Sequence, residues 1–128
     1  MAKDSERGAA AVEFALVAPI LVMLLLGIME FGRAYNAQVS LTNAAREGVR
    51  VMAVSNNQAS ARTAAKNAVV SLNPTLADSN IAFRSTDGTS GCTADRQMTV
   101  TITYSLRTLT GIAGPFTMTG RGVMQCGG

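Results

Sequence analysis

One carboxylate, Glu13, lies inside the apolar run that covers residues 9–28. A charge placed in hydrocarbon is costly and tends to mark a functional position. Residues 14–28 carry no charge, and an apolar run of about 20 residues is long enough to cross a bilayer core. The sequence therefore predicts a transmembrane segment over residues 9–29, in which Glu13 has a specific role.

Few other side chains in this sequence are suited to catalysis or metal binding. Histidine is absent and there are only two cysteines, which removes the commonest general base and leaves too few soft ligands for a structural zinc site. A membrane-tethered enzyme would have to use the carboxylates of Asp78, Asp87 and Asp95. These three occur in turn-like stretches, where turn chemistry explains them better, so we expect no catalytic residue, metal or cofactor.

The charge distribution does not favour a nucleic-acid partner. Eleven basic residues stand against eight acidic ones, there is no tryptophan, and the basic residues are scattered along the chain. Nucleic-acid binding usually needs a clustered basic face, with aromatic side chains where single strands are bound.

Three fates are open to the N-terminal segment on its residues alone. A cleaved secretory signal needs a small-residue site after the apolar run, and the following "GIMEFGRAYN" offers none. An uncleaved signal anchor needs no cleavage site. A cut between Gly8 and Ala9 would leave the apolar helix on the mature protein. The positive-inside rule gives little help with the orientation of this segment in the membrane, because Lys3 and Arg7 are offset by acidic neighbours.

The start of the chain resembles that of a type IV prepilin. Gly8 is followed by four small or apolar residues and then by Glu13 and Phe14, directly ahead of an apolar helix. The first 54 residues more closely resemble the TadE-like proteins, pseudopilins of the tight-adherence (Flp) pilus. The residues that carry this resemblance are Gly8, Glu13, Phe14, Pro19, Gly27, Glu30, Phe31, Gly32, Arg33, Ala44, Ala45, Arg46, Glu47, Gly48, Val49 and Arg50.

The resemblance implies a structural role and several partners. A prepilin peptidase would cut between Gly8 and Ala9, so that residues 1–8 are a leader. Glu13 would neutralise the N-terminal amine of a neighbouring subunit during assembly. Other pilins and the pilus assembly platform would be partners in a homo- or hetero-oligomeric filament. The N-terminus would lie inside the bacterial cytoplasmic membrane, and residues 55–128 outside it.

Some of these residues also have simpler explanations. Glu13 at the membrane interface would interact favourably with the helix N-terminus. Pro19 removes one helical hydrogen bond and kinks the helix, with or without a role in filament packing. Glu30 and Arg33 are three residues apart, a spacing that predicts an ion pair at the far interface.

The helical pattern continues beyond the membrane segment, so one helix is predicted over residues 9–54. Its second half gathers one face of small and apolar residues: Ala37, Leu41, Ala44, Ala45, Gly48 and Met52. "SNNQ" at 55–58 predicts a break. A second helix follows over 59–72, with Ala61, Ala65, Ala68, Val69 and Leu72 on one face and Asn73-Pro74 at its end.

Three strands are predicted after the second helix. Residues 97–106 alternate without error between apolar and hydroxyl side chains, which predicts a half-buried antiparallel strand. Residues 116–125 begin the same way, and Gly120 and Gly122 predict a β-bulge. Residues 80–85 predict an edge strand. The threonine-rich face of 97–106 is interpreted as solvated, although it could bind a partner.

If strands 97–106 and 116–125 form a hairpin, Cys92 and Cys126 become neighbours. A disulfide there would suit an oxidising, extracytoplasmic compartment; two free thiols are the alternative. The whole pattern predicts an α+β fold of the type IV pilin kind: a long N-terminal helix, a second short helix and a small antiparallel sheet. The leading functional hypothesis is a minor pilin, and the alternative is a single-span anchored binding domain outside the membrane.

Overall fold

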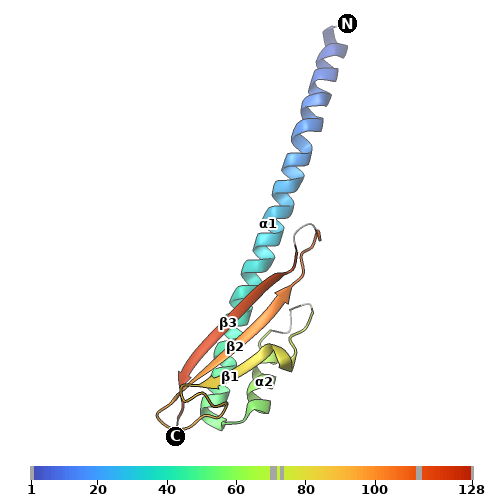
Figure 1. The fold of residues 1–128 in the computed structure, drawn as a ribbon. Coiled ribbons are helices and arrows are strands. Elements are labelled where there is room, and N and C mark those ends of the chain that lie inside the picture. Colours follow the sequence, from blue (N-terminus) through green and yellow to red (C-terminus); the bar gives the residue numbers. More distant parts are fainter. Residues whose placement is uncertain (1, 70–71, 73, 112–113, 128) are drawn as a thin grey trace. The chain divides into compact units, whose positions relative to one another are not determined.

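The computed structural model describes residues 2–69, 72, 74–111 and 114–127. Within these residues, two helices, one 3-10 turn and three strands follow one another (Figure 1). They are α1 (Ala2–Ser55), α2 (Gln58–Asn67), η1 (Asp78–Asn80), β1 (Ile81–Ser85), β2 (Gln97–Leu106) and β3 (Phe116–Gln125). The chain divides into two compact units, with the boundary between Arg33 and Ala34.

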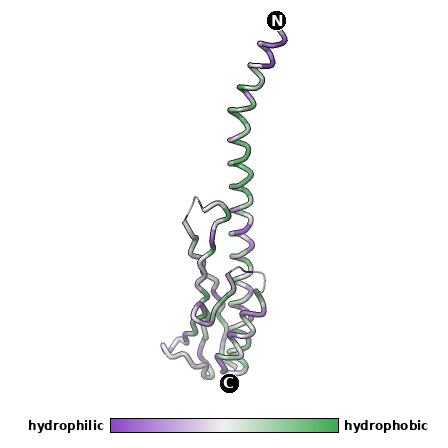
Figure 2. The backbone as a smooth tube through the Cα atoms, turned by 90° about the vertical axis from the view of Figure 1, so that its right-hand side faces the viewer, coloured by the Kyte–Doolittle hydropathy of each residue, from purple (hydrophilic) through white to green (hydrophobic). Residues whose placement is uncertain are grey.

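The first unit is helical throughout its described residues. Helix α1 begins at Ala2, earlier than the predicted start at residue 9. The charged head contains no helix breaker, and Asp4 in the first turn interacts favourably with the helix N-terminus. The apolar stretch that follows is visible as the green part of the tube (Figure 2).

The second unit contains one antiparallel sheet in the order β1-β2-β3. Strands β2 and β3 have the predicted boundaries, and β1 is a five-residue edge strand as expected. Alternate residues of β2, from Met98 to Leu106, are buried. The α+β, pilin-like class predicted from the sequence is confirmed.

The core of this unit lies between the sheet and the two helices. All six residues predicted for the inner face of α1 are buried: Ala37, Leu41, Ala44, Ala45, Gly48 and Met52. From α2 the core receives Ala61 and Ala65, each with no exposed surface. The helices present small side chains here, so their backbones can approach the sheet closely.

Helix α2 is shorter than predicted. It ends at Asn67, and the N–H of Ala68 caps it by donating to the carbonyls of Ala64 and Ala65. The prediction that Ala68 is on the buried face is wrong, because the chain leaves the helix at that residue and the side chain is exposed. Residues 70–71 and Asn73, which the sequence placed at the helix end, lie outside the described residues.

The predicted bulge at Gly120 and Gly122 is also wrong. Strands β2 and β3 pair one-to-one from Gln97↔Gln125 to Leu106↔Phe116, without an extra residue. The two glycines instead let β3 lie directly on α1. A Cβ on Gly120 would stand 2.5 Å from the carbonyl carbon and oxygen of Leu41, and one on Gly122 would stand 2.7 Å from the Ala45 carbonyl oxygen.

A disulfide joins Cys92 to Cys126, as the hairpin predicted, with 5.7 Å between their Cα atoms. Backbone contacts surround it: the N–H of Cys126 donates to the Arg96 carbonyl at 2.8 Å. The N–H of Cys92 donates to Oδ1 of Asn56 at 2.7 Å. Asn56 has a positive φ of 49°, a conformation that asparagine tolerates better than most residues. The last residues are thereby fastened to the end of α1.

Candidate functional site

The predicted cleavage bond lies within helix α1, on its exposed surface. Gly8 and Ala9 are both exposed, and nothing lies within 4 Å of where a Gly8 side chain would begin. Glycine in a helix interior destabilises it by roughly 0.5–1 kcal/mol relative to alanine. The Gly8–Ala9 bond is therefore a weak point of the helix that another protein could reach.

Glu13 is exposed and lies one helical turn from Ala9. Among the described residues its side chain makes no hydrogen bond or ion pair. The next side chain, Phe14, is 74% exposed. Both side chains are thus presented outward from α1.

The rest of the apolar stretch is equally uncovered. Its large hydrophobic side chains between Val12 and Phe31 are exposed within the chain itself, except that of Leu26, which is half-buried. This helix is long and apolar enough to cross a membrane, and an apolar surface of this size marks a membrane or protein contact. The helix continues through Pro19. Nothing lies within 4 Å of where side chains on Gly27 and Gly32 would begin.

The ion pair predicted after the apolar stretch is present. Nη1 of Arg33 lies 3.8 Å from Oε2 of Glu30, one helical turn away. The Glu30 side chain is the more covered of the two, 17% exposed against 35% for Arg33. Pairing lets these charged groups follow directly after a run of apolar residues.

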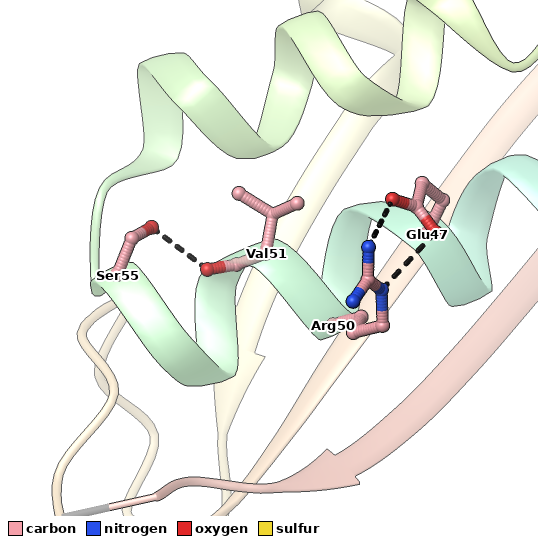
Figure 3. A network of polar contacts seen from close by, with 4 residues as sticks. All are labelled: Glu47, Arg50, Val51 and Ser55. Atoms are coloured by element: carbon pink, nitrogen blue, oxygen red, sulfur yellow. Dashed lines mark hydrogen bonds and ion pairs between the residues drawn. The ribbon is translucent and has the colours of Figure 1, made fainter.

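The family-like motif at 46–50 divides into packing and surface roles. A Cβ on Gly48 would lie 3.3 Å from that of Ala65, so this glycine lets α1 and α2 approach closely. Glu47 and Arg50 form a two-pronged pair, with Nη2 of Arg50 3.0 Å from Oε1 and Nε 3.3 Å from Oε2 (Figure 3). Arg46 is exposed. Within this motif, Gly48 thus serves the packing of α1 against α2, whereas Arg46 and the Glu47–Arg50 pair lie at the surface of α1.

The hydrogen bonds from Arg50 lower the pKa of Glu47, and the same contact raises the pKa of Arg50. Asp78 has its pKa lowered by the hydrogen bond from Lys66, whose Nζ is 2.7 Å from Oδ1. A carboxylate with a lowered folded-state pKa stabilises the fold above its unfolded pKa, about 4. That stabilisation is lost as the pH falls through the folded-state value.

The double variant Glu47→Gln/Asp78→Asn is expected to lose part of this acid dependence. Its thermal midpoint should change less between pH 6 and pH 3 than that of the unmodified protein, by a small amount because both pairs face solvent. Asp95→Asn is the control: Asp95 has a φ of 64°, which asparagine also adopts. Equal pH profiles for the double variant and the unmodified protein would contradict the prediction.

Of the three aspartates weighed as an enzyme's carboxylates, Asp78 and Asp87 make structural contacts, and Asp95 lies in a turn with a φ of 64°. Asp78 pairs with Lys66, and Oδ1 of Asp87 accepts from both the N–H and the hydroxyl of Thr89 at 3.0 and 2.6 Å. These contacts lower the pKa of Asp87. Within the described ranges, no three acidic, cysteine or histidine side chains gather as a metal site.

The sheet face that points away from the helices is exposed, apart from the half-buried Thr99 and Thr101, and we call it the outer sheet face. Its residues follow from the strand registers and the burial patterns. From β1 they are Ala82 and Arg84; from β2, Gln97, Thr99, Thr101, Thr103 and Ser105; from β3, Thr117, Thr119, Arg121, Val123 and Gln125. The face carries hydroxyls, amides and two arginines, and none of its residues is acidic.

Comparison with known families bears on the N-terminal part of the chain. Residues 8–50 match the family described as TadE-like protein. No curated protein and no solved structure matches the sequence. The matched range includes Gly8, Glu13, the apolar stretch and the 46–50 motif, and it ends before the sheet.

Proposed function

Because residues 8–50 form a TadE-like family domain, we propose that this chain is a minor pilin, or pseudopilin, of a Flp-type type IV pilus used in adherence. Before assembly it is held in the bacterial cytoplasmic membrane by the apolar part of α1, with the sheet unit outside. The observation that carries the proposal is an exposed apolar helix that begins with Gly8 and with Glu13, whose side chain has no partner among the described residues.

The chemistry of this segment suits assembly by cleavage and helix packing. Cutting after Gly8 would create an α-ammonium group on Ala9. When the apolar helix moves among other helices, a buried unpaired carboxylate is strongly unfavourable, and a paired one much less so. Glu13 would therefore select the axial position at which it meets the amine of a neighbouring subunit. The partners are a prepilin peptidase, other pilins and the assembly platform.

The mass of the N-terminus of the protein recovered from its native membrane tests the proposal directly. We expect a mature chain that begins at Ala9. Gly8→Phe should leave the chain intact, because the peptidase must accommodate residue 8, and a strain without the peptidase serves as a second control. An intact N-terminus in the presence of the peptidase would contradict the pilus assignment.

Glu13→Gln separates cleavage from assembly. We expect the variant to be cut normally, since Gly8 is intact, and its amount in sheared pili to fall by about tenfold or more, equivalent to at least 1.4 kcal/mol. Glutamine keeps the size of the side chain and removes its charge. Immunoblots of sheared pili and of membranes provide the measurement. Normal incorporation of Glu13→Gln would show that the carboxylate has no assembly role.

A second function is supported by the outer sheet face rather than by the N-terminal motif. The chain would be a single-span anchored domain that binds a partner outside the membrane and never enters a filament. This alternative needs neither cleavage after Gly8 nor Glu13. It follows if the N-terminus stays intact while the sheet unit still binds a ligand.

A further inference from the structure

Sheet topology brings together two arginines that are far apart in the sequence. Arg84 on β1 is paired with Thr99 of β2, and Arg121 on β3 is paired with Thr101. Directly paired residues of antiparallel strands lie on the same face. Thr99 and Thr101 therefore lie between the two arginines on the central strand, within the outer sheet face.

The spacing lets both arginines serve one ligand. Adjacent strands lie about 4.8 Å apart, and residues two positions apart in a strand about 6.8 Å. Arg84 and Arg121 are two strands and two residues apart, so their Cα atoms are about 12 Å from each other by the same geometry. Two long side chains at this separation can converge above the threonine hydroxyls or hold two neighbouring anionic groups.

Neither arginine is neutralised within the described residues. Among the described residues, the side chains of Arg84 and Arg121 have no hydrogen bond or ion pair, and the outer sheet face has no carboxylate of its own. Residues 34–128 contain eight basic and four acidic side chains, a formal net charge of +4. Of those acids, Glu47 and Asp78 are already paired with Arg50 and Lys66.

We propose that the outer sheet face binds an acidic polysaccharide, with Arg84 and Arg121 on its carboxylates and the hydroxyls of Thr99 and Thr101 on its sugar hydroxyls. Guanidinium groups bind carboxylates through paired, charge-assisted hydrogen bonds. Threonine hydroxyls donate and accept, which matches the hydroxyls of a sugar. The complementary charge and the mixed hydroxyl surface select this partner.

Other anionic partners fit the same face less well. Single-stranded nucleic acids need aromatic side chains for base stacking, and the outer sheet face has none. Duplex DNA is read by elements that enter a groove, which a broad three-stranded face does not do. A membrane surface attracts apolar or densely basic segments, whereas here two arginines are surrounded by hydroxyls and amides.

The inference goes beyond the pilus assignment. It concerns residues 82–125, outside the family match at 8–50, and would hold for a filament subunit or for an anchored domain. A failure of glycan binding would leave cleavage after Gly8 untouched, and an uncut N-terminus would leave glycan binding untouched.

Binding of the full-length chain, purified in a nonionic detergent, to immobilised polygalacturonate tests the inference, with uncharged pullulan as the reference surface. We expect salt-sensitive binding to polygalacturonate and none to pullulan. Arg84→Gln/Arg121→Gln should weaken binding about tenfold, the effect of two favourable guanidinium–carboxylate contacts. Thr99→Val/Thr101→Val should weaken it about threefold through lost hydroxyl hydrogen bonds.

Arg46→Gln/Arg96→Gln is the matched control, because it removes the same charge from residues outside the outer sheet face. It should change binding by less than about twofold, because a solvent-exposed charge that makes no direct contact with the ligand contributes only screened attraction. Equal losses in the two arginine pairs would overturn the inference in favour of unspecific attraction. No binding to polygalacturonate, or tighter binding to duplex DNA or to phosphatidylglycerol vesicles, would also overturn it. Unchanged thermal midpoints verify that all variants are folded.

Discussion

Replacing Gly120 with alanine is expected to lower the free energy of unfolding by about 3 kcal/mol, at the upper end of overpacking effects. The added Cβ would stand 2.5 Å from the carbonyl carbon and oxygen of Leu41. These are backbone atoms in the middle of a helix, and Leu41 itself is fully buried. The strand or α1 must therefore move as a whole, because no side chain can rotate away.

The sign of this effect separates two physical explanations of the same residue. Glycine within a strand costs conformational entropy, so alanine would stabilise a strand by roughly 0.5–1 kcal/mol if nothing opposed it. The contact with Leu41 predicts the opposite sign and a larger magnitude. Gly114→Ala is the control, since nothing lies within 4 Å of its added Cβ, and it should change the stability by less than about 0.5 kcal/mol.

Denaturant unfolding of the full chain in detergent, followed by tyrosine signals, measures both variants. The sequence has no tryptophan. Tyr104 is 3% exposed, and its hydroxyl donates to the Pro74 carbonyl at 2.7 Å, so its near-ultraviolet circular dichroism reports the sheet unit. Equal or greater stability of Gly120→Ala would show that β3 does not lie on the α1 backbone.

The second large effect concerns the disulfide. Cys92→Ala/Cys126→Ala is expected to lower the free energy of unfolding by about 3–4 kcal/mol, from the chain-entropy estimate for a closed loop of this length. The two sulfurs close a separation of 34 residues that contains both β2 and β3. Both cysteines are nearly buried, at 9% and 6% exposed, so alanine leaves little strain and a small void.

Dithiothreitol provides the comparison for this prediction. It should reduce the stability of the unmodified protein to nearly that of the double variant, and it should leave the double variant unchanged. Without the bridge, two backbone hydrogen bonds still hold the C-terminal residues. The N–H of residue 126 donates to the Arg96 carbonyl at 2.8 Å, and that of Gly127 donates to the Ala53 carbonyl at 3.2 Å. A loss below about 1 kcal/mol would mean that these bonds hold the terminus unaided.

Much of the fold could be predicted because it depends on local periodicity. The alternation over residues 97–106 defines one strand and its buried face, and the small residues from Ala37 to Met52 define the buried face of α1. The predicted hairpin brought Cys92 and Cys126 close together, with two free thiols as the alternative, and the structure joins them in a disulfide. The strand and the helix face are set by spacings of two, or of three to four, residues along the chain.

The features that could not be predicted from the sequence depend on contacts between distant segments. Gly120 and Gly122 fit a bulge or a close approach equally well, and only the position of α1 decides between them. The joint placement of Arg84 and Arg121 requires the strand order and two registers. The roles predicted for Gly8 and Glu13 require a peptidase and a second subunit, so they stay predictions.

If the chain is the filament subunit proposed above, it has to transmit tension, and the disulfide would limit how far its second unit can stretch. If the second unit were pulled open, the 34-residue separation from Cys92 to Cys126 would extend to roughly 120 Å in a reduced chain. In the oxidised chain the same segment contributes only the 5.7 Å between the two Cα atoms. Strands β2 and β3 lie within this segment, so the part of the chain that bears Arg121 stays covalently closed under load.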